Sequence, residues 1–378
     1  MNHDTLSAFR ASLHGVVPED TIEELSHIIP DHESDSEVAM AVAGIVKALP
    51  RELSSKQVVE AVISRLSFMQ REHQQRRGQS PGNSQTLTRS YYDNLLIEMR
   101  LIGAEEPSTK VELFGEVFAS PIMTAALSHL SAYRKDEYGQ MEFLAQGAKA
   151  AGCLHWVGMI ENDHFAQIME TGAKVIRIVK PYADEEKIIC QLRQAEALGA
   201  VAVGMDIDHA VTAYGDEDIV QGERMERKTL MQMQTYVQAT KLPFIVKGVL
   251  SVHDTLVSKE LGAKGVLLSH HGGRMAFAVP PPMLLPDIRR AVGNELNIFV
   301  DCGIASGMDA YKALALGADA VGVGTHLISY VRTGGADAVK NRLLEMTAEL
   351  KGVMSFTGIK NCIKFDPAII HRVQIRVD

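Results

Sequence analysis

A glycine that ends a helical segment and precedes a short apolar run recurs along this chain. The pattern occurs five times, with Gly152, Gly172, Gly199, Gly262 and Gly317 at the equivalent place. Glycine there suits the left-handed residue that closes a helix. The apolar runs are near-continuous rather than alternating, which is typical of strands buried on both faces of a helix-covered parallel sheet. The repeat therefore predicts an α/β fold built from successive strand–helix units.

The number of these units narrows the prediction further. The runs after the five glycines lie at 155–158, 175–179, 201–206, 266–269 and 320–324, and three more apolar runs occupy 121–126, 244–248 and 298–303. Eight evenly spaced strands of parallel type match the size of a (β/α)8 barrel. We therefore expect an α/β fold, a (β/α)8 TIM barrel with an N-terminal helical extension. An open doubly wound sheet is the alternative.

The chain before the barrel has a different character. Segments beginning at Thr21 and Ser54 look like capped helix starts ahead of apolar-periodic stretches. Residues 76–84 are polar and rich in Gly, Ser and Pro, which is typical of a linker. We expect a helical N-terminal region and linker over 1–84 and the barrel over 85–378. Nothing in the N-terminal part indicates chemistry, so packing or partner binding is its expected role.

Composition excludes several classes of function. The 378 residues carry a net charge of -9, which disfavours a nucleic-acid or anionic-membrane partner. No apolar run approaches the roughly 18 residues of a membrane span, and the first residues lack the pattern of a signal peptide. The cysteines form no CxxC pair and are expected to be free thiols: Cys153, Cys190, Cys302 and Cys362. These features predict a soluble cytoplasmic protein.

Polar residues gather where the predicted strands end. Active sites of barrels of this kind lie at the carboxyl ends of the strands. The strand ends here supply Asp206, Asp208, His209, Lys247, His270, His271, Arg274, Asp301, Thr325 and His326. Lys247 interrupts an apolar run, and a charge there is costly unless paired or functional. It is interpreted either as a cation beside an electron-rich ligand or as a buried salt bridge to an aspartate of a neighbouring strand.

The segment from Ser269 to Arg274, which reads Ser-His-His-Gly-Gly-Arg, is the densest of these groups. Histidine titrates near neutral pH, glycine lets a ligand approach the backbone, and arginine fits a carboxylate. Adjacent strand residues face opposite ways, so at most one histidine is expected to point into the pocket. Alternatives are a buried structural His271 or a metal site including Asp206, His209 and both histidines. We expect no metal.

These residues resemble the FMN-dependent α-hydroxy acid oxidases and dehydrogenases, the relatives of lactate oxidase and glycolate oxidase. The similarity is carried by residues 241–249, 261–274, 285–288 and 301–320. The resemblance implies FMN as cofactor. It implies that His271 is the general base as a hydride equivalent passes to the flavin, and that Asp206 orients this base. It further implies that Arg274 holds the substrate carboxylate and that Lys247 stabilises negative charge on the reduced flavin.

The same resemblance implies a cofactor-binding set, and it also exposes departures from the family pattern. The set is Ala126, Leu127, Ser128, Arg177, Lys247, Ser269, Asp301, Gly303, Ser306, Gly324 and Thr325. The two arginines that hold the FMN phosphate in the family are replaced by Ala305 and Thr325. Losing these contacts is expected to weaken binding by roughly a few kcal/mol. Gly204 stands for a flavin-contacting threonine, Arg177 for a glutamine and Val179 for a tyrosine of the substrate site.

The function indicated is the oxidation of a small 2-hydroxy acid, or a related carboxylate, by an FMN-dependent oxidoreductase. Two alternatives keep the barrel. One is a flavin-dependent isomerase or reductase, or a non-redox lyase or isomerase in which Lys247 forms a Schiff base. The other is a non-catalytic member that binds a ligand or partner. The resemblance also implies a homo-oligomer, with a tetramer as the form that many family members take.

Overall fold

The computed structural model describes residues 9–28, parts of 42–62, 83–131, 133–135, 137–212, 215–363 and 365–373. Its contacts divide the chain into two compact units. One consists of Met1–Pro81 with Val220–Gly222, and the other of Gly82–Ile219 with Glu223–Asp378. The domain boundary expected between residues 84 and 85 remains a prediction, and most of the expected linker at 76–84 lies outside the described residues. No helix in the described ranges is long and apolar enough to cross a membrane.

The first unit contains helix α2 (Glu19–Ile28), which begins two residues before the expected start at Thr21. The second expected start is at Ser54, whose backbone N–H and hydroxyl both donate to the side-chain oxygen of Gln57. A small apolar cluster holds this unit together: Phe9, Leu13, Ile22, Leu25, Val42, Ala43, Val46, Val58, Val59 and Val62. This cluster gives the unit a core of its own.

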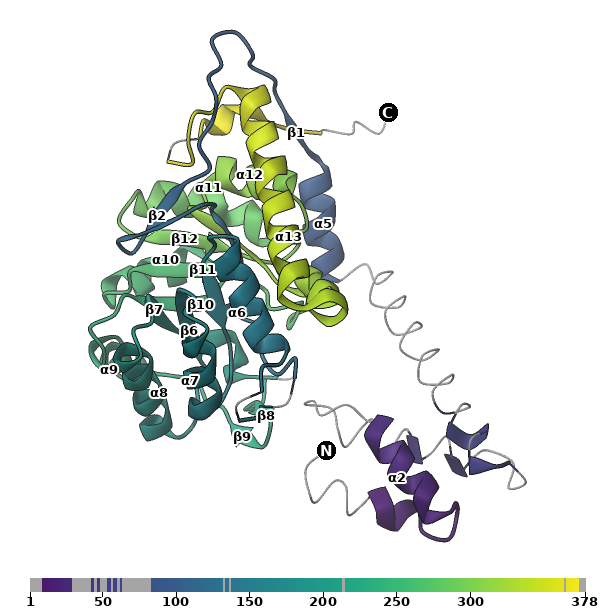
Figure 1. The fold of residues 1–378 in the computed structure, drawn as a ribbon. Coiled ribbons are helices and arrows are strands. Elements are labelled where there is room, and N and C mark those ends of the chain that lie inside the picture. Colours follow the sequence, from purple (N-terminus) through teal and green to yellow (C-terminus); the bar gives the residue numbers. More distant parts are fainter. Residues whose placement is uncertain are drawn as a thin grey trace, which may run out of the picture. The chain divides into compact units, whose positions relative to one another are not determined.

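Eight parallel strands form the barrel of the second unit, which confirms the predicted fold (Figure 1). They are β4 (Ile122–Thr124), β5 (His155–Val157), β6 (Val175–Val179), β7 (Ala202–Asp206), β10 (Phe244–Val249), β11 (Gly265–Leu268), β12 (Asn297–Val300) and β13 (Ala320–Val323). Hydrogen bonding follows the order β4-β13-β12-β11-β10-β7-β6-β5. A parallel bridge between Leu127, three residues beyond β4, and Val157 of β5 connects the two ends of this order. The sheet therefore closes on itself.

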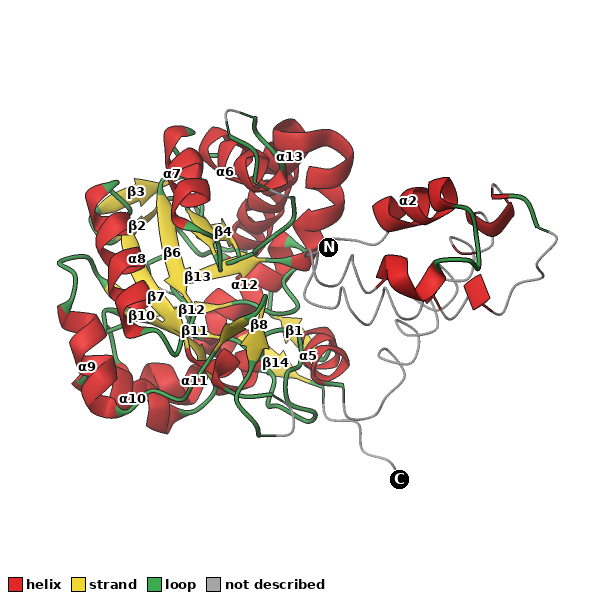
Figure 2. Ribbon diagram, turned by 90° about the horizontal axis from the view of Figure 1, so that it is seen from below, coloured by secondary structure: helices red, strands yellow, loops and turns green. Residues whose placement is uncertain are grey.

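Helices surround the strands, as Figure 2 shows. They are α6 (Gln140–Ala150), α7 (Asn162–Glu170), α8 (Glu185–Ala197), α9 (Leu230–Gln238), α10 (Val252–Glu260), α11 (Pro281–Val292), α12 (Gly307–Leu316) and α13 (Thr325–Thr357). The five glycines singled out in the sequence all have positive φ, between 69° and 121°. The backbone therefore takes the left-handed form there that glycine tolerates.

Shorter elements complete the unit. Helix α5 (Ser84–Asp93) precedes the barrel, and η1 (Ile207–Ala210) and η2 (Pro367–Ile369) are single 3₁₀ turns. Three small antiparallel pairs join β1 (Leu95–Ile97) to β14 (Ile370–Arg372), β2 (Val111–Leu113) to β3 (Glu116–Phe118), and β8 (Ile219–Val220) to β9 (Glu223–Arg224). Helix α5 is important for the site, because its residues contact the loops after β11 and β12.

The barrel interior is apolar along most of its length. Its buried side chains include Met123, Trp156, Ile176, Ile178, Ile245, Leu267 and Phe299. Because side chains alternate along a strand, the register Ile178–Gly204–Ile245 puts these three residues in one layer. The inward positions two residues further along the same strands are Lys180, Asp206 and Lys247. The apolar core thus ends in a layer of charged side chains.

Gly204 lies in the apolar layer with Ile178 and Ile245, at a position where the structure leaves no room for a side chain. A Cβ atom on Gly204 would lie 2.2 Å from the backbone oxygen of Ile245 and 2.8 Å from Cδ1 of Ile178. The threonine that the resemblance places here would therefore require the neighbouring strand to move. Loss of that side chain allows β7 and β10 to approach closely.

We expect Gly204→Ala to lower the free energy of unfolding by about 1–3 kcal/mol, the usual cost of overpacking a core. The reason is that the contact is with backbone, which cannot turn aside. Chemical denaturation followed by circular dichroism measures the effect. Gly352→Ala in α13 is the matched control, because a Cβ there meets nothing within 4 Å, and it is expected to be neutral or stabilising. Equal effects of the two substitutions would contradict this steric argument.

Candidate functional site

Asp206 forms the centre of the charged layer at the carboxyl ends of the strands. Its Oδ2 accepts a hydrogen bond from Lys180 Nζ at 2.9 Å, and its Oδ1 accepts one from Lys247 Nζ at 3.1 Å. All three side chains are buried. Buried charges are tolerated when they are paired, and here two ammonium groups share one carboxylate. The salt bridge considered for Lys247 is therefore present, and it lies beside the pocket rather than apart from it.

The pKa values of this group follow from these contacts. Burial acts to raise the pKa of Asp206, but the charges of Lys180, Lys247 and His271 outweigh it and hold that pKa well below its ordinary value. Burial lowers the pKa of Lys180. Burial also acts to lower the pKa of Lys247, yet the nearby aspartates raise it overall. Asp206 is thus ionised and Lys247 is the firmly held cation.

His271 lies beside this group, at the turn that follows β11. Its Nδ1 is 2.9 Å from Asp208 Oδ1, 3.4 Å from Asp206 Oδ2 and 3.0 Å from Lys247 Nζ. Burial and the Lys247 charge act to lower the pKa of His271, whereas Asp206 and Asp208 raise it, and the net shift is upward. The imidazole is therefore oriented by carboxylates on one nitrogen.

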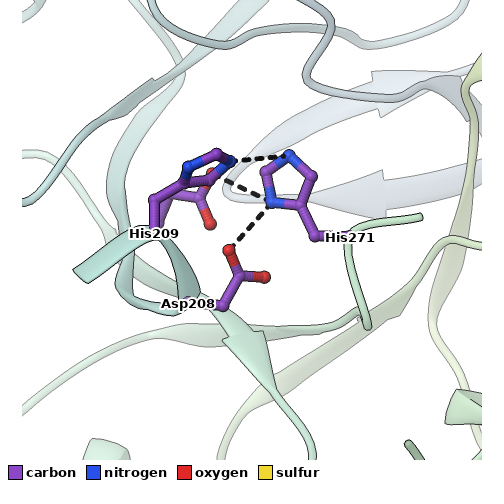
Figure 3. A group of neighbouring side chains, drawn as sticks. Asp208, His209 and His271 are labelled. Carbon is purple, nitrogen blue, oxygen red and sulfur yellow. Dashed lines mark hydrogen bonds and ion pairs between the residues drawn. The ribbon is translucent and has the colours of Figure 1, made fainter. Parts of the chain in front are cut away.

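The other nitrogen of His271 faces His209, as Figure 3 shows. The two Nε2 atoms are 3.3 Å apart, and Arg274 donates to His209 Nδ1 at 3.1 Å. His209 Nδ1 also lies 3.1 Å from Asp218 Oδ2, a contact that needs the proton on Nδ1, whereas the contact with Arg274 needs Nδ1 unprotonated. In the tautomer that accepts from Arg274, the proton of neutral His209 is on Nε2 and is donated to His271 Nε2. His271 Nδ1–H is then donated to Asp208. Burial and the charge of Lys180 lower the pKa of His209, which fits its neutral form.

Arg274, the expected carboxylate clamp, already has an anionic partner in this structure. Its NH2 group donates to Asp218 Oδ2 at 2.6 Å and to the backbone oxygen of Val211, also at 2.6 Å. Together with His209, these contacts use most of its donors. His209 therefore lies between Arg274 and His271. The Arg274 guanidinium is not part of the lining of the cavity that His271 borders.

The described residues enclose a cavity of about 900 Å³ at this end of the barrel. Eight of the predicted cofactor-binding residues line it: Ala126, Leu127, Lys247, Ser269, Asp301, Gly303, Gly324 and Thr325. Ser128 and Ser306 do not. Ser306 instead caps α12 by accepting the backbone N–H of Asp309 at 3.1 Å. A pocket of this size holds a cofactor-sized ligand.

The expectation that Arg177 meets the cofactor is not supported, because Arg177 lies on the outer face of β6. Its guanidinium donates to the side-chain oxygens of Gln194 at 2.6 Å and Asn162 at 3.0 Å, in the helix layer. Burial lowers its pKa to about 10. Alternation along β6 instead turns Lys180 inward. The sequence did contain this signal, since Lys180 follows Ile176 and Ile178 at intervals of two.

The expectation that only one of the two histidines faces the pocket is also wrong. Both His270 and His271 line the cavity. The reason is that β11 ends at Leu268, and His271 has a φ of +49°. Strand alternation no longer applies in this turn. His270 is held by Thr88 of α5, whose hydroxyl is 2.9 Å from its Nε2.

The cavity suits the ring end of FMN better than the phosphate end. Of the residues expected to meet the flavin, Ala126, Leu127 and Lys247 line the cavity. In the loop after β12 the amides already have acidic partners: Ala305 N–H, at the cavity wall, donates to Asp309 at 3.1 Å, and Gly307 N–H, which is not part of the lining, donates to Glu349 at 2.5 Å. The ring system therefore has a place, while the phosphate must be held by a different set of groups from the one the resemblance implies.

A metal ion was considered for this site. Ligand atoms of Asp206, Asp208, His209 and His271 all lie within 4.8 Å of one another. Asp206, however, is already compensated by two ammonium groups, which occupy the place that a divalent cation would need. The expectation that no metal is used remains a prediction.

Comparison with known proteins places the chain in a family. The model of the FMN-dependent dehydrogenases matches residues 73–240 and 220–372. The L-lactate oxidase of Lacticaseibacillus rhamnosus is 27% identical over 302 residues, covering 72% of this chain and 81% of that protein. The 2-hydroxyacid oxidase of Dictyostelium discoideum is 39% identical over 132 residues, covering 35% of this chain and 34% of that protein. A mandelate oxidase variant bearing an FMN adduct superposes with a TM-score of 0.67 at 25% identity, covering 75% of this chain and 90% of the other. This chain belongs to the FMN-dependent dehydrogenase family.

Proposed function

We propose that this chain, an FMN-dependent oxidoreductase by family, oxidises a small 2-hydroxy acid with His271 as the general base. The observation that carries the proposal is the placement of His271. One nitrogen is oriented by Asp208 and Asp206, and the ring borders a cavity of cofactor size. A base must be oriented and must reach the proton it removes. The contacts with Asp206 and Asp208 support the first requirement, and the position of His271 on the cavity wall supports the second.

The chain's own residues divide the work at the reacting centre. His271 Nε2 accepts the hydroxyl proton of the substrate, which replaces His209 as its hydrogen-bond partner. The resulting imidazolium is stabilised by the ionised Asp206 and by Asp208. Bound FMN supplies the acceptor for the two electrons that leave the substrate carbon. Lys247, the cation at the cavity wall, stabilises the negative charge that develops there.

Arg274 holds the substrate carboxylate in this proposal, and it must first leave Asp218. Asp218 accepts from Arg274 through one oxygen only, whereas a substrate carboxylate can accept through both of its oxygens. The exchange conserves charge, since one carboxylate replaces another. Asp218 then acts as a stand-in that keeps the guanidinium compensated when substrate is absent.

The test is the visible spectrum of the purified full chain. We expect the oxidised flavin spectrum, with bleaching when a 2-hydroxy acid such as lactate, glycolate or mandelate is added under anaerobic conditions. A flavin that is bound but stays oxidised with every 2-hydroxy acid tried would count against the substrate class. It would then favour an isomerase or reductase on the same barrel.

The alternative chemistry, the oligomeric state and the location of the protein also bear on this proposal. The Schiff-base form of the non-redox alternative is disfavoured, because the raised pKa of Lys247 keeps the amine protonated. The expected homo-oligomer and the cytoplasmic location follow from the resemblance and from composition. Size-exclusion chromatography with light scattering measures the former.

A further inference from the structure

Helix α5 closes one side of the cavity and is fixed against the loops that follow β11 and β12 and against helix α12. Ser84 Oγ donates to the backbone oxygen of Met275 at 2.8 Å, and Gln85 Nε2 donates to that of Gly272 at 2.7 Å. Lys312 of α12 donates to the backbone oxygen of Tyr92 at 2.8 Å. Residues far apart in the sequence are thereby held around one pocket. Any side chain that α5 directs into the cavity has a defined position there.

Arg89 is the cation that α5 contributes. It lines the same cavity as Ala305 and Thr325, the two positions where arginines are missing. Its NH1 donates to the backbone oxygen of Gly303 at 3.1 Å, so the guanidinium lies against the loop that follows β12. Its side chain keeps 38% of its exposure. Arg89 is therefore accessible from the cavity at the end where Ala305 and Thr325 lie.

The partners of Arg89 are carboxylates that a phosphate can replace. NH2 lies 2.8 Å from Asp309 Oδ1, and Nε donates to Asp93 at 2.9 Å. Asp309 also accepts the Ala305 N–H through its other oxygen. One aspartate thus bridges a guanidinium and a loop amide, which is the arrangement of groups that binds a phosphate oxygen.

His326 supplies a second donor at this end. It lies in the first turn of α13 and lines the cavity. Arg342 donates to its Nε2 at 3.0 Å and to the backbone oxygen of Ala305 at 2.7 Å. Since Nε2 is an acceptor, the proton of neutral His326 is on Nδ1. An additional N–H donor is therefore available beside Thr325.

We propose that Arg89 of α5, assisted by His326, binds the phosphate of FMN in this chain in place of the arginines missing at positions 305 and 325. The proposal rests on the family's use of FMN and concerns only its phosphate end. Asp309 is the internal competitor: it holds Arg89 when the cofactor is absent and yields it to the phosphate. The arginine that binds the phosphate then lies on a helix that precedes the barrel, and not in the loops after β12 and β13.

The experiment compares FMN with riboflavin, which has the same ring system but no phosphate. Full-length protein freed of flavin is titrated with each, and quenching of flavin fluorescence gives the dissociation constant. We expect Arg89→Met to weaken FMN binding by about 10- to 100-fold, as for the loss of one charge-assisted hydrogen bond, and to change riboflavin binding little. Arg89→Lys is expected to recover part of the loss. Arg100→Met is the matched control, because Arg100 pairs with Glu98 and Asp366 and does not line the cavity.

A second variant separates phosphate binding from a structural role. Asp309→Asn keeps an oxygen for the Ala305 N–H but removes the charge that competes for Arg89. If Arg89 serves the phosphate, this variant binds FMN more tightly and riboflavin unchanged. Equal weakening of both flavins by Arg89→Met, or unchanged FMN binding, would overturn the proposal. Failure of the wild-type chain to bind either flavin would instead overturn the proposed function.

Discussion

Replacing His271 with asparagine is expected to lower the rate at which a 2-hydroxy acid reduces the bound flavin by about 10²- to 10⁴-fold, the usual contribution of a general base. Asparagine keeps a polar group of similar size but cannot accept the proton. The raised pKa of His271 adds a second readout. The base must be neutral, so the wild-type rate should rise with pH through a value above 6.5, and this limb should vanish in the variant. Anaerobic stopped-flow absorbance measures both.

His270→Asn is the matched control for this substitution. His270 is the neighbouring residue, lines the same cavity and is held by Thr88 rather than by the carboxylates. Its loss is expected to change the reduction rate far less, with flavin still bound. Equal rates for wild type and His271→Asn would refute the assignment of the base, and so would a loss in His270→Asn as large as that in His271→Asn.

The barrel could be predicted from the sequence because its signals are local. Each strand is an apolar run long enough to cross the core, and five of them follow a glycine that does take a left-handed φ. The run 175–179, for example, follows the helix-ending Gly172 and is followed by Pro181. The structure returns it as β6 with the same limits. Parallel order follows once helices alternate with strands.

The parts of the site that the sequence missed depend on direction and on distance along the chain. Whether Arg177 or Lys180 faces inward depends on register, and a shift of one residue reverses every side chain. His270 and His271 share the cavity only because the strand ends early. The partnership of Arg274 with Asp218 spans 56 positions and crosses between two loops. Arg89 lies on a helix whose position over the barrel no local pattern reveals.

The buried ion pairs that Asp206 forms with Lys180 and Lys247 affect the stability of the fold as well as the chemistry of the site. Lys180 and Lys247 are both buried, and one carboxylate compensates the two ammonium groups. Removing one partner of a buried pair is strongly destabilising, because the remaining charge stays out of water. Removing the carboxylate here leaves two cations facing each other. The charged layer therefore makes Asp206 a residue on which folding depends.

Asp206→Asn is expected to lower the free energy of unfolding by about 3–5 kcal/mol, as for a broken buried ion pair, measured by urea denaturation at pH 7. The loss should shrink as pH rises. In the wild-type fold Asp206 opposes the lowering of the pKa of Lys180 by burial, so removing Asp206 lowers that pKa further below its ordinary value of 10.5. Over the added interval the unfolded variant holds more protons than the folded variant, and the stability of the variant rises with pH toward that of the wild type. Adding Lys180→Met to Asp206→Asn removes one of the two unpaired cations and should restore a large part of the loss. Asp208→Asn, which leaves both lysines paired with Asp206, is the control. If the double variant is no more stable than Asp206→Asn alone, the charge of Lys180 is not the cause of the loss, and the site owes its stability to packing instead.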